Sequence, residues 1–133
     1  MSMVLRVAIV PILGVLACAT GQRLSQGPQL EGARGDVERS VEGNVTHVVV
    51  HVHHLTRPSD VGPDATAFVV WARPADGGSP KNLGALRLDH EDGELETSTK
   101  LRSFELFITA EPSPTNHEPW GEKLMWTEID GGN

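Results

Sequence analysis

The sequence predicts an all-β fold, an antiparallel two-sheet sandwich of about seven short strands. Three observations predict it. After residue 35, apolar side chains recur at every second position, as in strands that bury one face. Glycine- and proline-rich turns separate these segments, and no segment of ten or more residues after the N-terminal apolar run keeps a helical period with caps. Each sheet then has one apolar face, which a second sheet covers.

The first two strands are expected at residues 36–41 and 44–55, joined by the turn at residues 42–44. The second is the clearest segment of the chain because β-branched residues occupy its buried face. We expect Val48, Val50 and Val52 to point into the core. The opposite face then carries His47, Val49, His51 and His53.

The third strand, residues 66–73, is nearly continuous in apolar character, which predicts a central strand covered on both faces. Residues 83–89 and 94–101 form the next two, with a hairpin turn at residues 91–93. The last two are residues 104–110 and 123–129. The loop between them, residues 111–119, holds three prolines and is expected to lack regular structure.

The strand pattern is compatible with two architectures, a sandwich and a small closed barrel, of which we expect the sandwich. It would be immunoglobulin-like in architecture only, because the single cysteine excludes an intramolecular disulfide. Trp71 and Trp126 fall within strands and are expected in or near the core. Trp120 lies in a loop, where we expect its ring to plug the end of the sandwich rather than to stack on a sugar or enter a partner.

The N-terminus has the order of a secretory signal. Arg6 precedes an apolar stretch at residues 7–16. This stretch is too short to cross a bilayer, because a spanning helix needs about 20 apolar residues. The stretch ends in Val15-Leu16-Ala17-Cys18, which resembles the lipobox of bacterial lipoproteins. That resemblance implies that the signal is removed and that Cys18 carries the lipid. A buried core cysteine is the alternative.

The lipobox predicts three parts of the chain: a signal peptide at residues 1–17, a lipid anchor and flexible tether at 18–34, and the sandwich domain at 35–131. The tether is expected because residues 20–32 are rich in Gly, Gln and Ser and lack a period that would bury a face. By resemblance, Ala19 after the cysteine favours the outer over the inner membrane. The protein is therefore expected at the cell envelope, facing the periplasm or the exterior.

The net charge restricts the partners. It is −7, and removal of a signal whose one charged residue is Arg6 leaves −8. An acidic chain without a basic stripe is repelled by phosphate backbones, so no nucleic acid is expected. The expected partners are the membrane, through the lipid on Cys18, and a protein of the envelope.

Three histidines are the best candidates for chemistry. His47, His51 and His53 share one strand face, and a His-x-His pair lies about 7 Å apart along it. With a carboxylate or imidazole from a neighbouring strand, such a pair can chelate zinc or copper. The alternative, which we favour, is a solvated strand face with no cofactor; His90 and His117 are expected to lie in polar loops.

Catalysis is not expected. The chain has no Gly-x-Ser-x-Gly turn, and Gly77-Gly78 opens no helix that would cradle phosphate. A hydrolase would need a serine, a histidine and a carboxylate brought together by the fold. We therefore predict a non-catalytic binding, sensing or structural module, with metal binding as the alternative.

A family resemblance covers residues 44–129. It rests on Phe68-Val69-Val70-Trp71, on Asn82-Leu83-Gly84-Ala85-Leu86 after a Gly/Pro-rich loop, and on Phe107-Ile108-Thr109-Ala110-Glu111-Pro112. These motifs resemble the extracytoplasmic C-terminal domain of anti-sigma-K factors. The cytoplasmic helical domain and transmembrane helix of that family have no counterpart in this sequence. The resemblance therefore implies the outer module alone, without sigma-factor binding.

Overall fold

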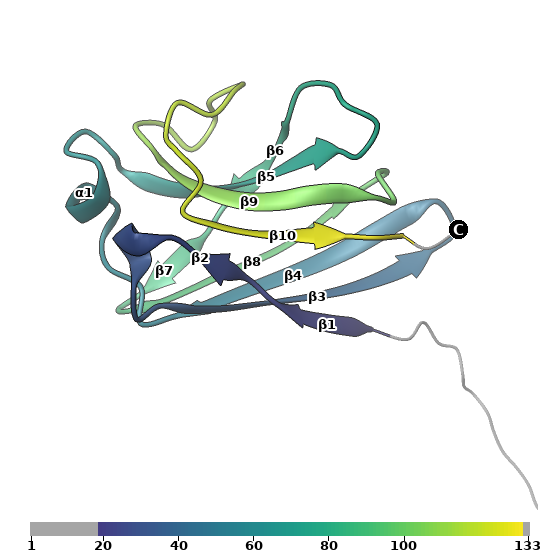
Figure 1. Ribbon diagram of the computed structural model, residues 1–133, viewed down its shortest axis with the longest axis horizontal. Coiled ribbons are helices and arrows are strands. Elements are labelled where there is room, and N and C mark those ends of the chain that lie inside the picture. The colour runs from purple at the N-terminus through teal and green to yellow at the C-terminus, as the bar shows by residue number, and fades with distance from the viewer. Residues whose placement is uncertain (1–18, 132–133) are drawn as a thin grey trace, which may run out of the picture.

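The computed structural model describes residues 19–131, which form two antiparallel five-stranded sheets packed face to face (Figure 1). Sheet A has the strand order β1-β3-β4-β8-β7, and sheet B has the order β2-β10-β9-β5-β6. The predicted two-sheet sandwich is confirmed, and the closed barrel is not formed. Sheet A contains β1 (Thr20–Arg23), β3 (Arg34–Glu42), β4 (Val45–His53), β7 (Arg87–Asp89) and β8 (Asp92–Thr99). Sheet B contains β2 (Ser25–Gln26), β5 (Ala67–Pro74), β6 (Lys81–Ala85), β9 (Phe104–Glu111) and β10 (Met125–Ile129).

Two short helical turns complete the fold, the 3-10 turn η1 (Pro28–Leu30) and the helix α1 (Pro58–Val61). No helix within residues 19–131 has the length and apolar character needed to cross a bilayer.

The core lies between the two sheets. From sheet A it receives the three valines of β4 that the alternation assigned to the buried face, Val48, Val50 and Val52, all 0% exposed. Sheet B contributes side chains from β5, β9 and β10, namely Phe68, Val70, Ala72, Phe104, Leu106, Ile108, Met125 and Ile129. Burial of such apolar surface is the main favourable term in folding, at about 25 cal/mol per Å².

The chain crosses between the sheets at both edges of the sandwich. At one edge Leu24 separates β1 from β2, and its N–H donates to the Gly35 carbonyl at 2.9 Å. At the other edge Leu86 separates β6 from β7, and its N–H donates to the Phe68 carbonyl at 2.8 Å. The first crossing needs a glycine, because a Cβ on Gly35 would lie 2.6 Å from Leu24 Cδ1 and 2.9 Å from Met125 Cε.

Residues 20–32 are the main correction to the predicted fold. They were expected to be a flexible tether, but β1 pairs with β3 in sheet A and β2 pairs with β10 in sheet B. Leu24 and Leu30 are each 1% exposed in the core. These scattered leucines follow no strand or helix period because the segment changes sheets at Leu24, so periodicity could not reveal their burial.

Two smaller differences concern the strand expected at residues 83–89 and the hairpin turn that follows it. The segment expected as one strand at residues 83–89 is two strands, because Leu86 marks the crossing between sheets. The hairpin turn expected at residues 91–93 lies at His90 and Glu91, since Asp89 already pairs with Asp92 and His90 has a φ of 58°. With β1 and β2 added, residues 19–131 form ten strands instead of the seven predicted.

The outer face of sheet B is covered near its middle. Val69, Trp71 and Phe107 lie on this face, are at most 1% exposed and form a second small core. Lys123, in the segment between β9 and β10, lies over the Phe107 ring, and Figure 1 shows this segment arching over the sheet. The prediction that the third strand is covered on both faces is therefore confirmed.

Candidate functional site

The histidine face of β4 is where the sequence places its candidate ligands. Alternation along the strand directs His47, His51 and His53 to the outer surface of sheet A, with side chains 47%, 44% and 48% exposed. The register sets their neighbours. His51 lies between Asp36 of β3 and Glu94 of β8, whereas His47 lies between Ser40 and Ser98.

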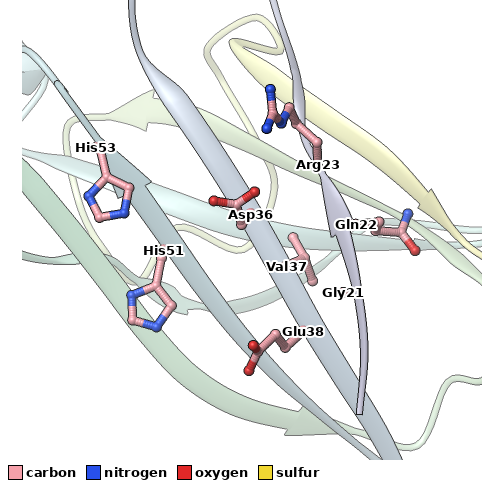
Figure 2. Close-up of a pocket in the computed structure, with 8 residues that line it drawn as sticks. All are labelled: Gly21, Gln22, Arg23, Asp36, Val37, Glu38, His51 and His53. Atoms are coloured by element: carbon pink, nitrogen blue, oxygen red, sulfur yellow. The ribbon is translucent and has the colours of Figure 1, made fainter.

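His51 and His53 border two shallow hollows. The larger, about 480 Å³, lies toward β1 and β3, and Figure 2 shows both imidazoles on one side of it with Asp36 between them and Arg23. The smaller, about 260 Å³, lies toward β7 and β8, and its wall includes Arg87, Asp92 and Glu94. The two imidazoles therefore stand on a ridge with a carboxylate-lined depression on each side.

Each imidazole of this face pairs with its own carboxylate. His53 Nδ1 lies 3.0 Å from an Asp92 oxygen, and His51 Nε2 lies 3.8 Å from a Glu94 oxygen. Glu94 also accepts a hydrogen bond from Arg87 at 3.2 Å. A row of ionisable side chains thus crosses sheet A from edge to edge, through Arg23, Asp36, His51, Glu94 and Arg87.

His47 does not join the other two histidines. It is four residues from His51 along the strand, about 13 Å, and its Nε2 lies 3.2 Å from a Glu42 oxygen near the β3–β4 turn. Across residues 19–131, no group of three or more His, Cys, Asp or Glu side chains is arranged to hold a metal ion. The candidate ligands that the fold does bring together are His51 and His53, flanked by Asp92 and Glu94.

Glu111 is the centre of a second site, which the sequence analysis did not identify as functional. Its side chain is 0% exposed and points to the covered outer face of sheet B. Its carboxylate accepts hydrogen bonds from the Thr109 hydroxyl (2.5 Å), the Asn116 amide (2.9 Å) and the backbone N–H groups of Trp120 and Gly121 (3.0 and 3.1 Å). Thr109 in turn accepts from the Trp71 indole N–H at 2.9 Å.

This network holds the segment after β9, which we call the Trp120 loop (residues 112–123). Gly121 packs so closely that a Cβ there would lie 2.7 Å from the Ala110 carbonyl. The ring of Trp120 makes no hydrogen bond in this network and is 74% exposed. The prediction that this ring plugs the end of the sandwich is therefore wrong: the backbone of Trp120 is anchored, and its side chain meets solvent.

The sequence offered little signal for Glu111. By strand alternation Phe107, Thr109 and Glu111 share the face opposite the core, and a glutamate on such a face is normally solvated. The position of Glu111 in the sequence gave the only signal. This carboxylate comes directly before a proline-rich loop that contains asparagine and glycine, and the N–H groups of these residues are free to turn toward the carboxylate.

Cys18 lies outside the described residues. In residues 19–131 no hydrogen bond joins a serine hydroxyl to an imidazole, the contact on which the hydrolase alternative depends. His90 is 94% exposed in the β7–β8 turn, as expected of a polar loop residue. Comparisons with protein-family models, curated proteins and solved structures find no match to this chain.

Proposed function

We propose that this chain is a lipoprotein held on the bacterial cell envelope through Cys18, and that its sandwich is a non-catalytic binding module whose contact surface is the Trp120 loop. The anchor is supported by the charged start, the apolar stretch and the lipobox-like end of residues 15–18.

The binding surface rests on one observation, a large exposed aromatic ring on a backbone held by a fully buried carboxylate. A tryptophan that is 74% exposed forgoes the burial of its apolar ring. The Glu111 network orders the loop in advance, which lowers the entropy lost when a partner binds. Tryptophan on a preorganised loop is typical of interface residues that dominate binding energy. The resemblance to an extracytoplasmic outer module agrees with a binding role.

The anchor is tested in a bacterial host by metabolic labelling with an alkyne-bearing fatty acid and by intact-mass measurement. The parent chain should incorporate the label and show a mass that starts at Cys18 with added acyl groups. Cys18→Ala should show neither, whereas Ser25→Ala, a matched change in β2, should behave as the parent does. An unmodified thiol on a chain that still begins at Met1 would refute the anchor.

The binding surface is tested with a photo-crosslinking amino acid placed at residue 120 of the lipidated protein. The control places it at Glu96, which is exposed on the outer face of sheet A. A discrete envelope-protein adduct at residue 120 that is absent at residue 96, and that is lost when Glu111→Gln loosens the loop, supports the proposal. Equal adducts at both positions, or none at residue 120, would refute the assignment of the Trp120 loop.

Metal binding is the second candidate function, and the ridge of His51 and His53 favours it. Asp92 and Glu94 already lie within 4 Å of these imidazoles, so modest side-chain rotations would gather nitrogen and oxygen ligands of the kind that zinc and copper accept. A soluble chain that starts at Ala19 should then melt at a higher temperature with zinc or copper. His51→Ala should abolish that rise, and the matched His47→Ala should keep it. No rise with either ion removes this candidate.

A further inference from the structure

We propose that the lipid on Cys18 seats the sandwich end-on on the bilayer, with the β3–β4 turn toward the membrane and α1 on the far side. This inference rests on the proposed lipidation of Cys18. It goes further by assigning the surface of the domain that meets the lipid and the surfaces that remain free.

The chain between the lipidated residue and the fold is short. β1 begins at Thr20, which pairs with Arg39 of β3. Only Ala19 separates Thr20 from Cys18, and each residue spans at most about 3.6 Å, so the lipidated residue lies within about 7 Å of Thr20. The expected tether would have let the domain stand off and rotate freely. Its incorporation into both sheets removes that freedom.

The direction of β1 places the anchor at one end of the sandwich. It runs antiparallel to β3, so the chain before Thr20 lies toward the C-terminal end of β3, where Gly43 and Asn44 form the turn into β4. Figure 1 shows the start of β1, the β3–β4 turn and the end of β10 at one end of the sandwich, with α1 and β7 at the other. The anchor is therefore at one end of the molecule rather than at its middle.

The two ends of the sandwich differ in charge. The anchored end carries Arg39, Lys100 and Arg102, none of which forms an ion pair within residues 19–131, and these three cations balance the nearby carboxylates Glu42, Asp76 and Asp130. The opposite end has an excess of carboxylates, because Glu31, Asp60, Asp64, Asp89, Glu91 and Asp92 outnumber Arg34, Arg57 and Arg87 there. Anionic headgroups attract juxtamembrane cations and repel carboxylates, so the field of the bilayer favours the same orientation as the anchor.

End-on seating has a consequence for both candidate sites. The nine residues of β4 span about 30 Å, so the α1 end stands well beyond the headgroup layer. The outer faces of the two sheets then stand roughly upright on the membrane. Both the Trp120 loop and the ridge of His51 and His53 remain open to partners from the side.

The test uses the full lipidated protein in vesicles of phosphatidylethanolamine and phosphatidylglycerol that contain a headgroup spin-labelled lipid. Cys18 is the sole cysteine and is consumed by the lipid, so an added cysteine takes a single fluorophore. Three exposed positions are labelled in turn: Asn44→Cys at the anchored end, Glu91→Cys at the far end of sheet A, and Gln29→Cys at the far end of the β1–β2 edge. The spin label should quench the fluorophore at residue 44 and leave those at residues 29 and 91 unquenched.

Other patterns overturn the orientation. Quenching at residue 29 equal to that at residue 44 indicates a sandwich lying on its edge, and quenching at residue 91 indicates one lying on sheet A. No quenching at any position of a vesicle-bound protein indicates a domain that stands off the membrane. A matched control inserts about twelve Gly/Ser residues between Ala19 and Thr20, a linker of about 20 Å, which should abolish the quenching at residue 44. A protein that carries no lipid by mass and does not bind vesicles refutes the proposed function itself, which separates that failure from a wrong orientation.

Discussion

Replacing Glu111 by glutamine tests whether a buried carboxylate holds the Trp120 loop. The amide keeps the shape of the side chain but turns one of its two acceptor oxygens into an NH₂ group. Oε1 accepts from Asn116 and Trp120, and Oε2 accepts from Thr109, Trp120 and Gly121, so either orientation of the amide directs an NH₂ group at N–H donors. We expect Glu111→Gln to lose at least two charge-assisted hydrogen bonds.

The expected loss in the free energy of unfolding follows from those hydrogen bonds. Hydrogen bonds to a charged partner contribute about 1.5–3 kcal/mol each, and the site is fully buried, so solvent does not replace them. The loss of two predicts a free energy of unfolding lower by about 3 kcal/mol or more. Urea unfolding of the chain that starts at Ala19, followed by tryptophan fluorescence, measures this change.

The matched control is Glu96→Gln, which makes the same chemical change on an exposed side chain of β8 with no hydrogen bond or ion pair in the described part of the chain. It should shift the free energy of unfolding by less than about 0.5 kcal/mol. Hydrogen exchange gives a local readout, since the amides of Trp120 and Gly121 should lose protection in Glu111→Gln alone. A Glu111→Gln protein as stable as Glu96→Gln, with both amides still protected, would refute the role of Glu111.

Three further substitutions test the core, a glycine at the irregular β5–β6 pairing and a helix cap. Val50→Ala removes two methyl groups at the centre of the core and should lower the free energy of unfolding by about 2–3 kcal/mol, while Val49→Ala on the outer face of the same strand should cost much less; equal costs would contradict the facing of β4. Gly84 has a φ of +128° and would bring a Cβ to 3.2 Å from Leu95, so Gly84→Ala should destabilise the chain by about 1 kcal/mol or more in urea unfolding, whereas no loss would mean that β6 relaxes freely. The Thr56 hydroxyl, and then the Arg57 N–H, donate to Asp60 and hold the pKa of that carboxyl below 3.8. A lowered pKa stabilises the folded state at neutral pH and loses this effect as the pH falls through the folded-state pKa, so Asp60→Asn should weaken α1 at pH 7 and cease to matter in strong acid; an NMR titration midpoint at or above 3.8 would contradict this.

Most strands followed from the sequence because alternation is a local property. Successive side chains of a strand point to opposite faces, so the order of residues in β4 was enough to assign Val50 to the core and His51 to the outer surface. The same reasoning failed for residues 20–32. A segment that changes sheets at Leu24 has no single face to bury, and hence no period.

The candidate sites depended on contacts between strands that are distant in sequence. Alternation put three histidines on one face, but the pairing of β4 with β3 and β8 decided that His51 meets carboxylates on both sides and that His47 meets serines. Glu111 was beyond prediction for a related reason. Its burial depends on the path of the loop that follows, which returns the backbone of Trp120 and Gly121 to its carboxylate.

The sequence alone determined the class of fold, the facing of the long strands and the N-terminal pattern that predicts export and lipid attachment, because each is written in the types and spacing of neighbouring residues. Only the tertiary structure decided that residues 20–32 belong to the sandwich instead of forming a tether, that Glu111 is buried and that Trp120 is exposed. These properties arise from hydrogen bonds and packing between segments up to about a hundred residues apart, such as Gln22 with Thr127, and local spacing carries no record of them.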